Sequence, residues 1–402
     1  MTTQVSGPEV GSAADGLSAG EANAAAPQLS GWTRVAAWLG AGGLIYLLVC
    51  AVNIMSRGFR SLSGDAARSL FAFADRPLVA LAVGVLVTVL IQSSTTKTAI
   101  TVTAVGTGAL TLRHSVPLIL GANIGTTVTS TIVALGFANE PEKFRRAFTG
   151  AGISDWFNVL AVAIFLPLEI WLHLLERTSR ALANLLYGAG QSDLSSFDPV
   201  RTLTTPVVTG VSSATAHLSD TLGPLVMIMV GVLLILVVVR YLGSVLKLLM
   251  IGRAQEWLQA AVGRNDAVAM AAGTGVTIAT QSSTVTNTVL IPFVGVGALT
   301  PRQLYPLTLG AGLGTTLTSV LAAFAVTGGS AKIGLQAAFV HVLFNVFAIL
   351  VIFVIPVLRP IPLRCAEAVA TVATRHKWFA AVYIVALFLL VPALIIALYA
   401  IP

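Results

Sequence analysis

Long apolar runs and short polar strings alternate along the chain. Residues 32–55 form the first long apolar run, which is long enough for a membrane-spanning helix because about 20 apolar residues cross a bilayer. A shorter apolar run, residues 78–91, is followed by a polar string at 92–98 and a second apolar stretch at 99–110. Neither apolar stretch spans a bilayer comfortably, so this pattern predicts a re-entrant helical hairpin whose polar tip reaches the middle of the membrane.

The same pattern occurs twice. The string Gln-Ser-Ser-Thr at residues 92–95 returns at residues 281–284, an offset of 281 − 92 = 189 residues. The string Gly-x-x-x-Gly-Thr-Thr at residues 121–127 returns at residues 310–316, and 310 − 121 is again 189. Two strings with one offset predict a duplicated unit. Duplicated units with broken helices are typical of secondary transporters, whose site lies between the repeats.

Further apolar runs complete the predicted architecture. Residues 115–135 and 304–325 are each interrupted by their glycine- and threonine-rich string, which favours a helix that unwinds locally. Residues 148–166 and 336–355 are predicted to close the two repeats as spanning helices. We therefore predict an all-α polytopic membrane protein with two inverted repeats, each with a re-entrant helical hairpin and an unwound spanning helix.

The predicted boundaries divide the chain into six segments. These are a disordered N-terminal tail (1–30), a first spanning helix with an interfacial segment (31–76), transport repeat 1 (77–166), a connector with a spanning helix at 222–250 (167–266), transport repeat 2 (267–357), and a basic linker with a C-terminal spanning helix (358–402). The tail is rich in Ala, Gly and Ser and has no basic residue, so it does not have the pattern of a signal peptide.

Composition agrees with a multi-pass protein of the cell (inner or plasma) membrane. The chain is 56% hydrophobic and only 10% charged, whereas roughly a quarter of the residues of a soluble domain are charged. The formal net charge of +7 has two readings: basic loops that face anionic lipid, or a field that attracts an anionic solute. Arg and Lys occur in nearly every loop, so the orientation is not predicted. The two cysteines, Cys50 and Cys365, imply no disulfide or metal framework.

The polar strings carry the candidate chemistry. Ser, Thr and Gln offer neutral oxygens for a hard cation and donors for an oxyanion, and a helix N-terminus at a hairpin tip adds oriented N–H groups. The alternative is that small residues merely allow tight helix packing; their repetition in register favours a functional role. The sequence has no nucleotide-binding loop, zinc-type cluster or nucleophile triad. It therefore predicts no enzyme activity, no cofactor and no nucleic-acid partner.

Longer motifs resemble the type II sodium-dependent inorganic phosphate cotransporter family, as in a bacterial-type member. The resemblance covers roughly residues 78–166 and 267–356, and the motifs that carry it are residues 91–95, 121–127, 146–151, 154–158, 305–310 and 341–345. It implies a symporter that imports phosphate with sodium by alternating access around a site between the two hairpin tips. Its implied partners are phosphate, co-transported sodium and the lipid bilayer, with a possible homo-oligomer. A proton-coupled or sodium-independent carrier, a passive anion channel and a structural membrane subunit remain alternatives.

The resemblance also implies a set of site residues. The phosphate ligands would be Gln92, Ser93, Ser94, Thr95, Ser282, Ser283 and Thr284. The sodium ligands would be Gln281, Ser282, Thr315 and Thr318, with a second set in the first repeat at Gln92, Ser93, Thr126 and Thr129.

Two departures from the family pattern bear on coupling. The second turn has Ala311 and Gly312 where the family usually has Ser and Asn, so one sodium site is expected to be weakened or absent. Lys97 lies opposite Thr286 in the repeat, where the family usually has a small hydroxyl residue. Its ammonium group either snorkels to the interface, or replaces a bound cation or contacts the anion.

Several further polar residues lie on apolar helices. Asp155 and Asn158 share a helical face, as do His341 and Asn345, because three- and four-residue spacings place side chains on one side of a helix. Polar packing within the bundle and a role in supporting the tips or coupling the ions both remain open. The candidates for support or coupling are Lys97, Asn123, Asp155, Asn158, Asn287, His341 and Asn345.

Overall fold

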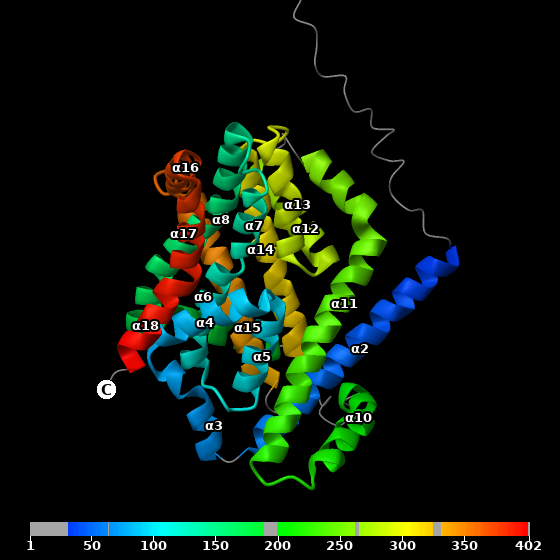
Figure 1. Cartoon of the computed structure of the whole chain (residues 1–402). Helices are drawn as coiled ribbons and strands as arrows, with labels where there is room; N and C mark the ends of the chain where they lie inside the picture. Colours follow the sequence, from blue (N-terminus) through cyan, green and yellow to red (C-terminus); the bar gives the residue numbers. More distant parts are fainter. Residues whose placement is uncertain (1–30, 63, 189–198, 262–264, 325–330, 401–402) are drawn as a thin grey trace, which may run out of the picture.

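The computed structural model describes residues 31–62, 64–188, 199–261, 265–324 and 331–400 (Figure 1). Every regular element in these ranges is a helix, which confirms the all-α prediction. Six of the described helices are long and apolar enough to cross a membrane: Gly31–Ser61, Leu112–Leu135, Pro141–Leu172, Leu222–Leu242, Lys332–Phe353 and Lys377–Tyr399. The protein is therefore a multi-pass membrane protein. The predicted tail, residues 1–30, lies outside the described residues.

The helices follow one another with short connections. The first half contains α2 (Gly31–Ser61), α3 (Gly64–Phe71), η1 (Ala72–Asp75), α4 (Pro77–Ile91), α5 (Ser94–Gly106), α6 (Leu112–Gly125), α7 (Val128–Leu135), α8 (Pro141–Leu172), α9 (Leu174–Gly188) and α10 (Pro199–Thr215). The second half contains α11 (Leu222–Ala261), α12 (Asp266–Thr280), α13 (Ser283–Gly295), α14 (Pro301–Phe324), α15 (Ala331–Ala348), η4 (Ile349–Phe353), α16 (Pro360–Arg375), α17 (Lys377–Val385), η5 (Ala386–Leu390) and α18 (Val391–Ala400).

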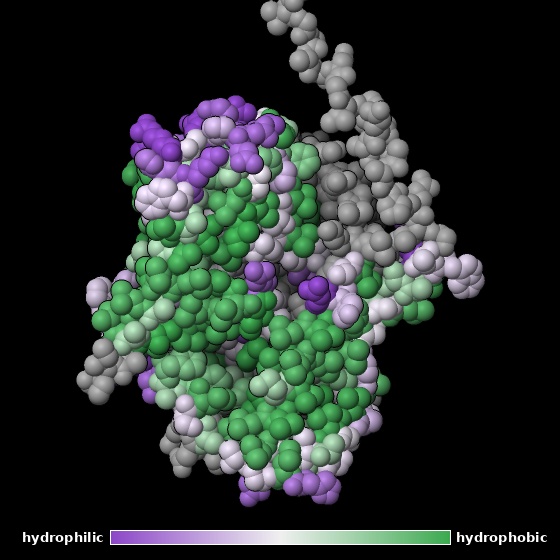
Figure 2. Space-filling view, viewed as in Figure 1, coloured by the Kyte–Doolittle hydropathy of each residue, from purple (hydrophilic) through white to green (hydrophobic). Residues whose placement is uncertain are grey.

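The surface has the layering expected of a protein in a bilayer. Figure 2 shows hydrophobic residues over most of the middle of the visible face, with hydrophilic residues gathered at its upper and lower ends. Large apolar side chains of the spanning helices are exposed, among them Leu39 on α2 and Leu394 on α18. Exposed apolar surface on this scale is favourable in lipid and unfavourable in water.

The predicted duplication is visible as two helix–turn–helix units with the same dimensions. In both units an outer arm of 15 residues, α4 or α12, is followed by an inner arm of 13 residues, α5 or α13. At 1.5 Å per residue these arms are about 20–22 Å long, which is shorter than the roughly 30 Å hydrocarbon core of a bilayer. A single arm therefore cannot cross a membrane.

Close backbone contacts at glycines hold each outer arm against the helix that follows its unit. A Cβ atom added at Gly121 of α6 would lie 2.1 Å from the carbonyl oxygen of Leu81 on α4. One added at Gly310 of α14 would lie 2.0 Å from the carbonyl oxygen of Met270 on α12. Leu81 and Met270 are themselves 270 − 81 = 189 residues apart, so the two units repeat the same packing. The correspondence extends to Gly84 with Gly273 and to Gly125 with Gly314.

The two repeats meet in a shared apolar core. The rings of Phe165 on α8 and Phe344 on α15 are in edge-to-face contact, with centroids 6.0 Å apart. Tyr305 on α14 contacts Phe157 of α8 and Phe353 of η4, with centroids 6.1 and 5.0 Å away. Helices α2 and α11 lie side by side at one edge of the molecule, and α16 to α18 lie at the opposite edge in Figure 1. The candidate site lies between these edges, among helices of both repeats.

The expected unwinding occurs in one repeat only. In the first repeat Thr126 and Thr127 separate α6 from α7. In the second repeat α14 continues without a break through the matching string, so the prediction of an unwound helix there is wrong. The hydroxyls of Thr315 and Thr316 donate to the carbonyls of Ala311 and Leu313 within the same helix. The glycines of this string allow α14 to pack closely against α12, and this packing does not require the helix to unwind.

The connector contains more helix than the sequence analysis assigned. Besides α11, which continues to Ala261, it includes α9 and α10. Helix α9 buries Leu175 and Ala183 and packs against α15. The polar composition of this segment made it resemble a loop in the sequence, although its apolar residues share one helical face.

Replacing Gly310 with Ala should destabilise the fold. The added methyl group cannot be accommodated 2.0 Å from the Met270 carbonyl oxygen, so α12 and α14 must separate; overpacking of this kind costs about 1–3 kcal/mol. Thermal unfolding in detergent micelles measures the change. The control is Gly42→Ala on α2, where an added Cβ meets nothing within 4 Å. Equal unfolding temperatures for the two variants would show that the α12–α14 contact tolerates a side chain.

Candidate functional site

The tips of the two helix–turn–helix units have the same backbone geometry. Gln92 and Gln281 both have φ 54° and ψ 26°, in the left-handed region, and this turns the chain between the arms. The next residues, Ser93 and Ser282, cap the inner arms: each hydroxyl oxygen accepts a hydrogen bond at 3.2 Å from the backbone N–H three residues later. The cap leaves the first two N–H groups of α5 and of α13 without a helical acceptor. Such groups can bind an anion.

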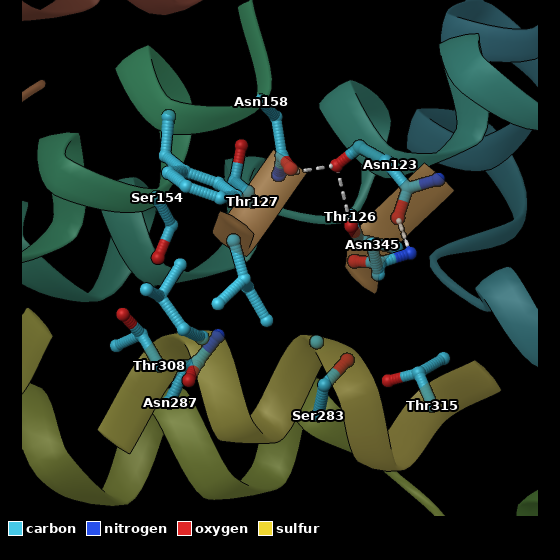
Figure 3. Close-up of a pocket in the computed structure, with 14 residues that line it drawn as sticks. Asn123, Thr126, Thr127, Ser154, Asn158, Ser283, Asn287, Thr308, Thr315 and Asn345 are labelled. Atoms are coloured by element: carbon cyan, nitrogen blue, oxygen red, sulfur yellow. Dashed lines mark hydrogen bonds between the residues drawn. The ribbon is translucent and has the colours of Figure 1, made fainter. Parts of the chain in front are cut away.

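A cavity of about 40 Å³ lies where one of these tips meets helices of both repeats. Figure 3 shows residues of the first repeat facing residues of the second repeat across it. Since one water needs roughly 10–15 Å³, the cavity has room for more than one water molecule. It is lined by Asn123, Thr126, Thr127, Ser154, Phe157, Asn158, Ser283, Asn287, Thr308, Leu309, Gly312, Thr315, Asn345 and Ile349.

The polar lining of the cavity consists of neutral groups. Hydroxyls and amides predominate, and none of the described lining residues is charged. A small anion or a hard cation could therefore bind only through directed donors and oxygens, without a permanent counter-charge in the wall. The buried side-chain oxygen Oδ1 of Asn287 has no hydrogen-bond partner within the described structure. One acceptor beside the cavity is therefore unsatisfied.

The break between α6 and α7 frees a backbone carbonyl beside the cavity. The N–H of Thr127 bonds to the carbonyl of Ile124, so the carbonyl of Asn123 loses its helical partner. That carbonyl instead accepts from the amide of Asn158 at 2.9 Å and from the hydroxyl of Thr126 at 2.8 Å. Both bonds are drawn in Figure 3. The break thus attaches α8 to the cavity wall.

A buried network joins the two repeats behind the cavity. The Asn123 amide nitrogen donates to the carbonyl of Ile119, which leaves its Oδ1 to face Nε2 of His341 at 3.3 Å. Nε2 must then carry the proton, and Nδ1 accepts from the hydroxyl of Ser319 at 2.8 Å. Asn345 also donates to Oδ1 of Asn123, at 3.4 Å. The network therefore fixes the orientation of two cavity-lining amides.

Asp155 is a buried acid on α8, adjacent in sequence to the lining residue Ser154. Its Oδ2 accepts from the hydroxyls of Thr131 at 3.0 Å and Tyr383 at 3.2 Å. Its Oδ1 has no hydrogen-bond partner in the described part of the chain. A buried carboxylate oxygen without a partner is costly unless something binds it, so Oδ1 is a candidate cation ligand.

The sequence-predicted residues fall into three groups. The cavity brings together Asn123, Thr126, Asn158, Ser283, Asn287, Thr315 and Asn345. Nine further predicted residues are not among its lining residues, although the second tip, the amide network and Asp155 adjoin it: Gln92, Ser93, Lys97, Thr129, Asp155, Gln281, Ser282, Thr284 and His341. The side chains of Ser94, Thr95 and Thr318 lie outside the described part of the structure.

Seven of the lining residues were not among the predicted site residues: Thr127, Ser154, Phe157, Thr308, Leu309, Gly312 and Ile349. Thr127 and Thr308 lie in motifs that the sequence analysis quoted, and Ser154 opens the string that ends at Asn158, as His341 opens the one that ends at Asn345. That correspondence between the repeats was the available signal for Ser154. Gly312 was noted in the sequence only because the family usually has Asn at this position. Without a side chain at Gly312, this part of the cavity stays open.

A second polar cluster lies at the end of α8. Ligand atoms of Glu169, His173 and Glu176 lie within 4.8 Å of one another, as in a metal site. The Glu169 carboxylate, however, accepts from the N–H groups of Leu175 and Glu176, at 2.6 and 3.2 Å. It therefore caps the N-terminus of α9, a structural role that accounts for its burial.

Known proteins resemble the chain over most of its length. A family model described as Na+/Pi-cotransporter matches residues 47–191 and 233–356. Sodium-dependent phosphate transport protein 2B of Pongo abelii is 30% identical over 89% of this chain and 64% of its own length. Protein 2A of Ovis aries is 31% identical over 88% of this chain and 66% of its own length, and protein 2A of Oryctolagus cuniculus is 32% identical over 87% and 65%. The chain thus spans about two thirds of the length of these relatives. No solved structure matches it.

Proposed function

Since the chain belongs to the Na+/Pi-cotransporter family, we propose that it imports inorganic phosphate coupled to sodium. Its relatives are named as sodium-dependent phosphate transport proteins. The observation that carries the proposal is the cavity lined by neutral hydroxyls and amides of both repeats, beside a helix N-terminus with unassigned N–H groups. Such a site binds an anion through directed donors and can release it again.

Phosphate is proposed to bind at the two tips. Its ligands are Gln92, Ser93, Ser94, Thr95, Ser282, Ser283 and Thr284, together with the N–H groups of the first turns of α5 and α13. Ser283 lines the cavity directly and is buried, which supports its place in this set. A buried hydroxyl that donates to an oxyanion is worth more than one in water, because the local dielectric is low.

Sodium is proposed to bind through neutral oxygens of Gln281, Ser282, Thr315 and Thr318, and at the matching residues Gln92, Ser93, Thr126 and Thr129. Neutral oxygens suit a hard cation that must dissociate again. Asp155 adds a candidate carboxylate ligand, because its Oδ1 has no hydrogen-bond partner in the described part of the chain. Its charge would also help to balance bound sodium.

The transport mechanism is proposed to be alternating access between two inverted repeats in the cell membrane. The tips would lie near the bilayer midplane, since arms of about 20–22 Å reach into a membrane without crossing it. The repeats would move against each other around the fixed site, as in other transporters built from duplicated units. The segments proposed for this movement are residues 77–166 and 267–357.

Uptake of labelled phosphate into proteoliposomes tests the proposed function. Accumulation above the external concentration, driven by an inward sodium gradient, is the expected result. Accumulation without sodium would indicate a proton-coupled or sodium-independent carrier, and equilibration without accumulation would indicate a passive channel. Absence of any phosphate flux would contradict the proposal.

The variant Ser283→Ala should bind phosphate more weakly. Removing one donor to a buried oxyanion costs about 1–3 kcal/mol, so the phosphate concentration at half-maximal uptake should rise roughly five- to hundredfold. Ser244→Ala is the matched control, because this hydroxyl bonds within α11 on an exposed surface. An unchanged phosphate affinity in Ser283→Ala would remove Ser283 from the site.

The variant Thr315→Val should affect sodium more than phosphate. Valine keeps the shape of threonine and deletes the hydroxyl oxygen, so the sodium concentration for half-activation should rise several-fold. Phosphate affinity at saturating sodium should change by less than twofold. Thr316→Val is the control: Thr316 also donates to a carbonyl of its own helix but does not line the cavity. If both variants have the parent's sodium dependence, Thr315 is not a ligand.

A further inference from the structure

Lys97 is a buried lysine one turn into α5, behind the first tip. Its side chain is only 2% exposed, and the ammonium nitrogen donates to the carbonyl oxygen of Leu118 on α6. None of the described ion pairs includes it. It therefore does not snorkel to an interface, and a cation held by a backbone carbonyl without a carboxylate partner requires an explanation.

The second repeat has hydroxyls at the same place. The counterpart of Lys97 is Thr286, since 286 − 97 = 189. The hydroxyl of Thr286 lies 2.8 Å from that of Thr277 and 3.3 Å from the carbonyl oxygen of Ser282, and both threonines are buried. The second repeat thus offers a group of neutral oxygens where the first repeat holds an ammonium group. The two matching units therefore differ by one fixed positive charge, which is present only in the first repeat.

The charges near the cavity indicate what this difference does. The cavity lining is neutral, and the buried charged residues of the described chain are Lys97, Asp155 and Glu169, of which Glu169 caps α9. Asp155 has an unpartnered oxygen and Lys97 has no acid partner. Lys97 donates to the carbonyl of Leu118 on α6, the helix that also carries Asn123 of the cavity wall. At 1.5 Å of rise per residue, Leu118 lies about 7–8 Å along α6 from Asn123, so a positive charge held there can act on an anion in the cavity.

We propose that the ammonium group of Lys97 is a built-in cation of the transport site and replaces one of the sodium ions that would otherwise bind with phosphate. This inference rests on the proposed function. Phosphate carries between one and two negative charges near neutral pH, and burying it requires positive charge nearby. A charge fixed in the protein satisfies this requirement without entering the cell. The chain then couples phosphate to one sodium ion fewer than a chain with a hydroxyl at this position.

The number of coupled sodium ions in Lys97→Thr tests the inference. With the membrane potential held at zero and a tenfold sodium gradient, each coupled sodium multiplies the limiting phosphate ratio across the proteoliposome membrane by about ten. We expect the limiting ratio to be about tenfold higher in Lys97→Thr than in the parent, with a steeper sodium dependence of uptake. Lys143→Thr is the control, because Lys143 is a partly exposed lysine paired with Glu140.

Each outcome has a distinct meaning. A parent protein without sodium-driven phosphate accumulation contradicts the proposed function, not the role of Lys97 alone. A parent that accumulates phosphate with the same limiting ratio as Lys97→Thr overturns the inference. The inference is also overturned if Lys97→Thr changes the pH dependence of phosphate uptake without changing the number of coupled sodium ions.

Sodium binding without transport gives a second measurement. Sodium alone should raise the unfolding temperature of purified Lys97→Thr more than that of the parent, because the variant binds an additional ion. Lys97→Met, which removes the charge without adding a hydroxyl, should lose phosphate affinity at least tenfold at every sodium concentration. If Lys97→Thr does not fold, a Lys97→Met protein with the parent's phosphate affinity would still overturn the inference.

Discussion

The arrangement of the site depends on contact between helix backbones at glycine residues. Side chains at Gly121 and Gly310 would collide with carbonyl oxygens of the neighbouring outer arm. With no side chain there, each outer arm lies directly on the next helix of its repeat, which determines where the tip ends. The tip geometry at Gln92 and Gln281 is then set by local cap bonds. Tight packing of small residues and a binding role for the polar strings are compatible, because glycines make the helix contact and hydroxyls remain for a ligand.

The two repeats differ in structure beside the cavity. Thr126 and Thr127 interrupt one helix, whereas the matching string leaves α14 intact. The free carbonyl that results attaches Asn158 of α8, so the break is also a means of joining helices. The network through His341 then ties the first repeat to α14 and α15. The two repeats thus have matching helix packing but place different polar groups on the two sides of the site.

Much of this organisation could be predicted from the sequence. The 189-residue offset gave the duplicated unit, and the short apolar runs gave the lengths of the arms, because both are properties of the chain itself. The continuity of α14 could not be predicted, since glycine and threonine are equally common in unwound and in closely packed helices. Helix α9 was missed because its buried face depends on α15, which is distant in sequence. Among the lining residues, Thr308 faces the cavity through tertiary packing, which no local pattern encodes.

The pair formed by Asn123 and Gly312 has a consequence for how such a molecule can be assembled. They occupy equivalent positions, 312 − 123 = 189 residues apart, and both line the cavity. A Cβ at Gly312 would already lie 3.3 Å from Oδ1 of Asn345, which is closer than an ordinary contact. Two identical half-length chains would have to carry the same residue at both places, either crowding the space or giving up the amide that anchors His341. The two positions can differ only when the halves have different sequences, so this cavity requires two unequal halves and excludes a dimer of identical ones.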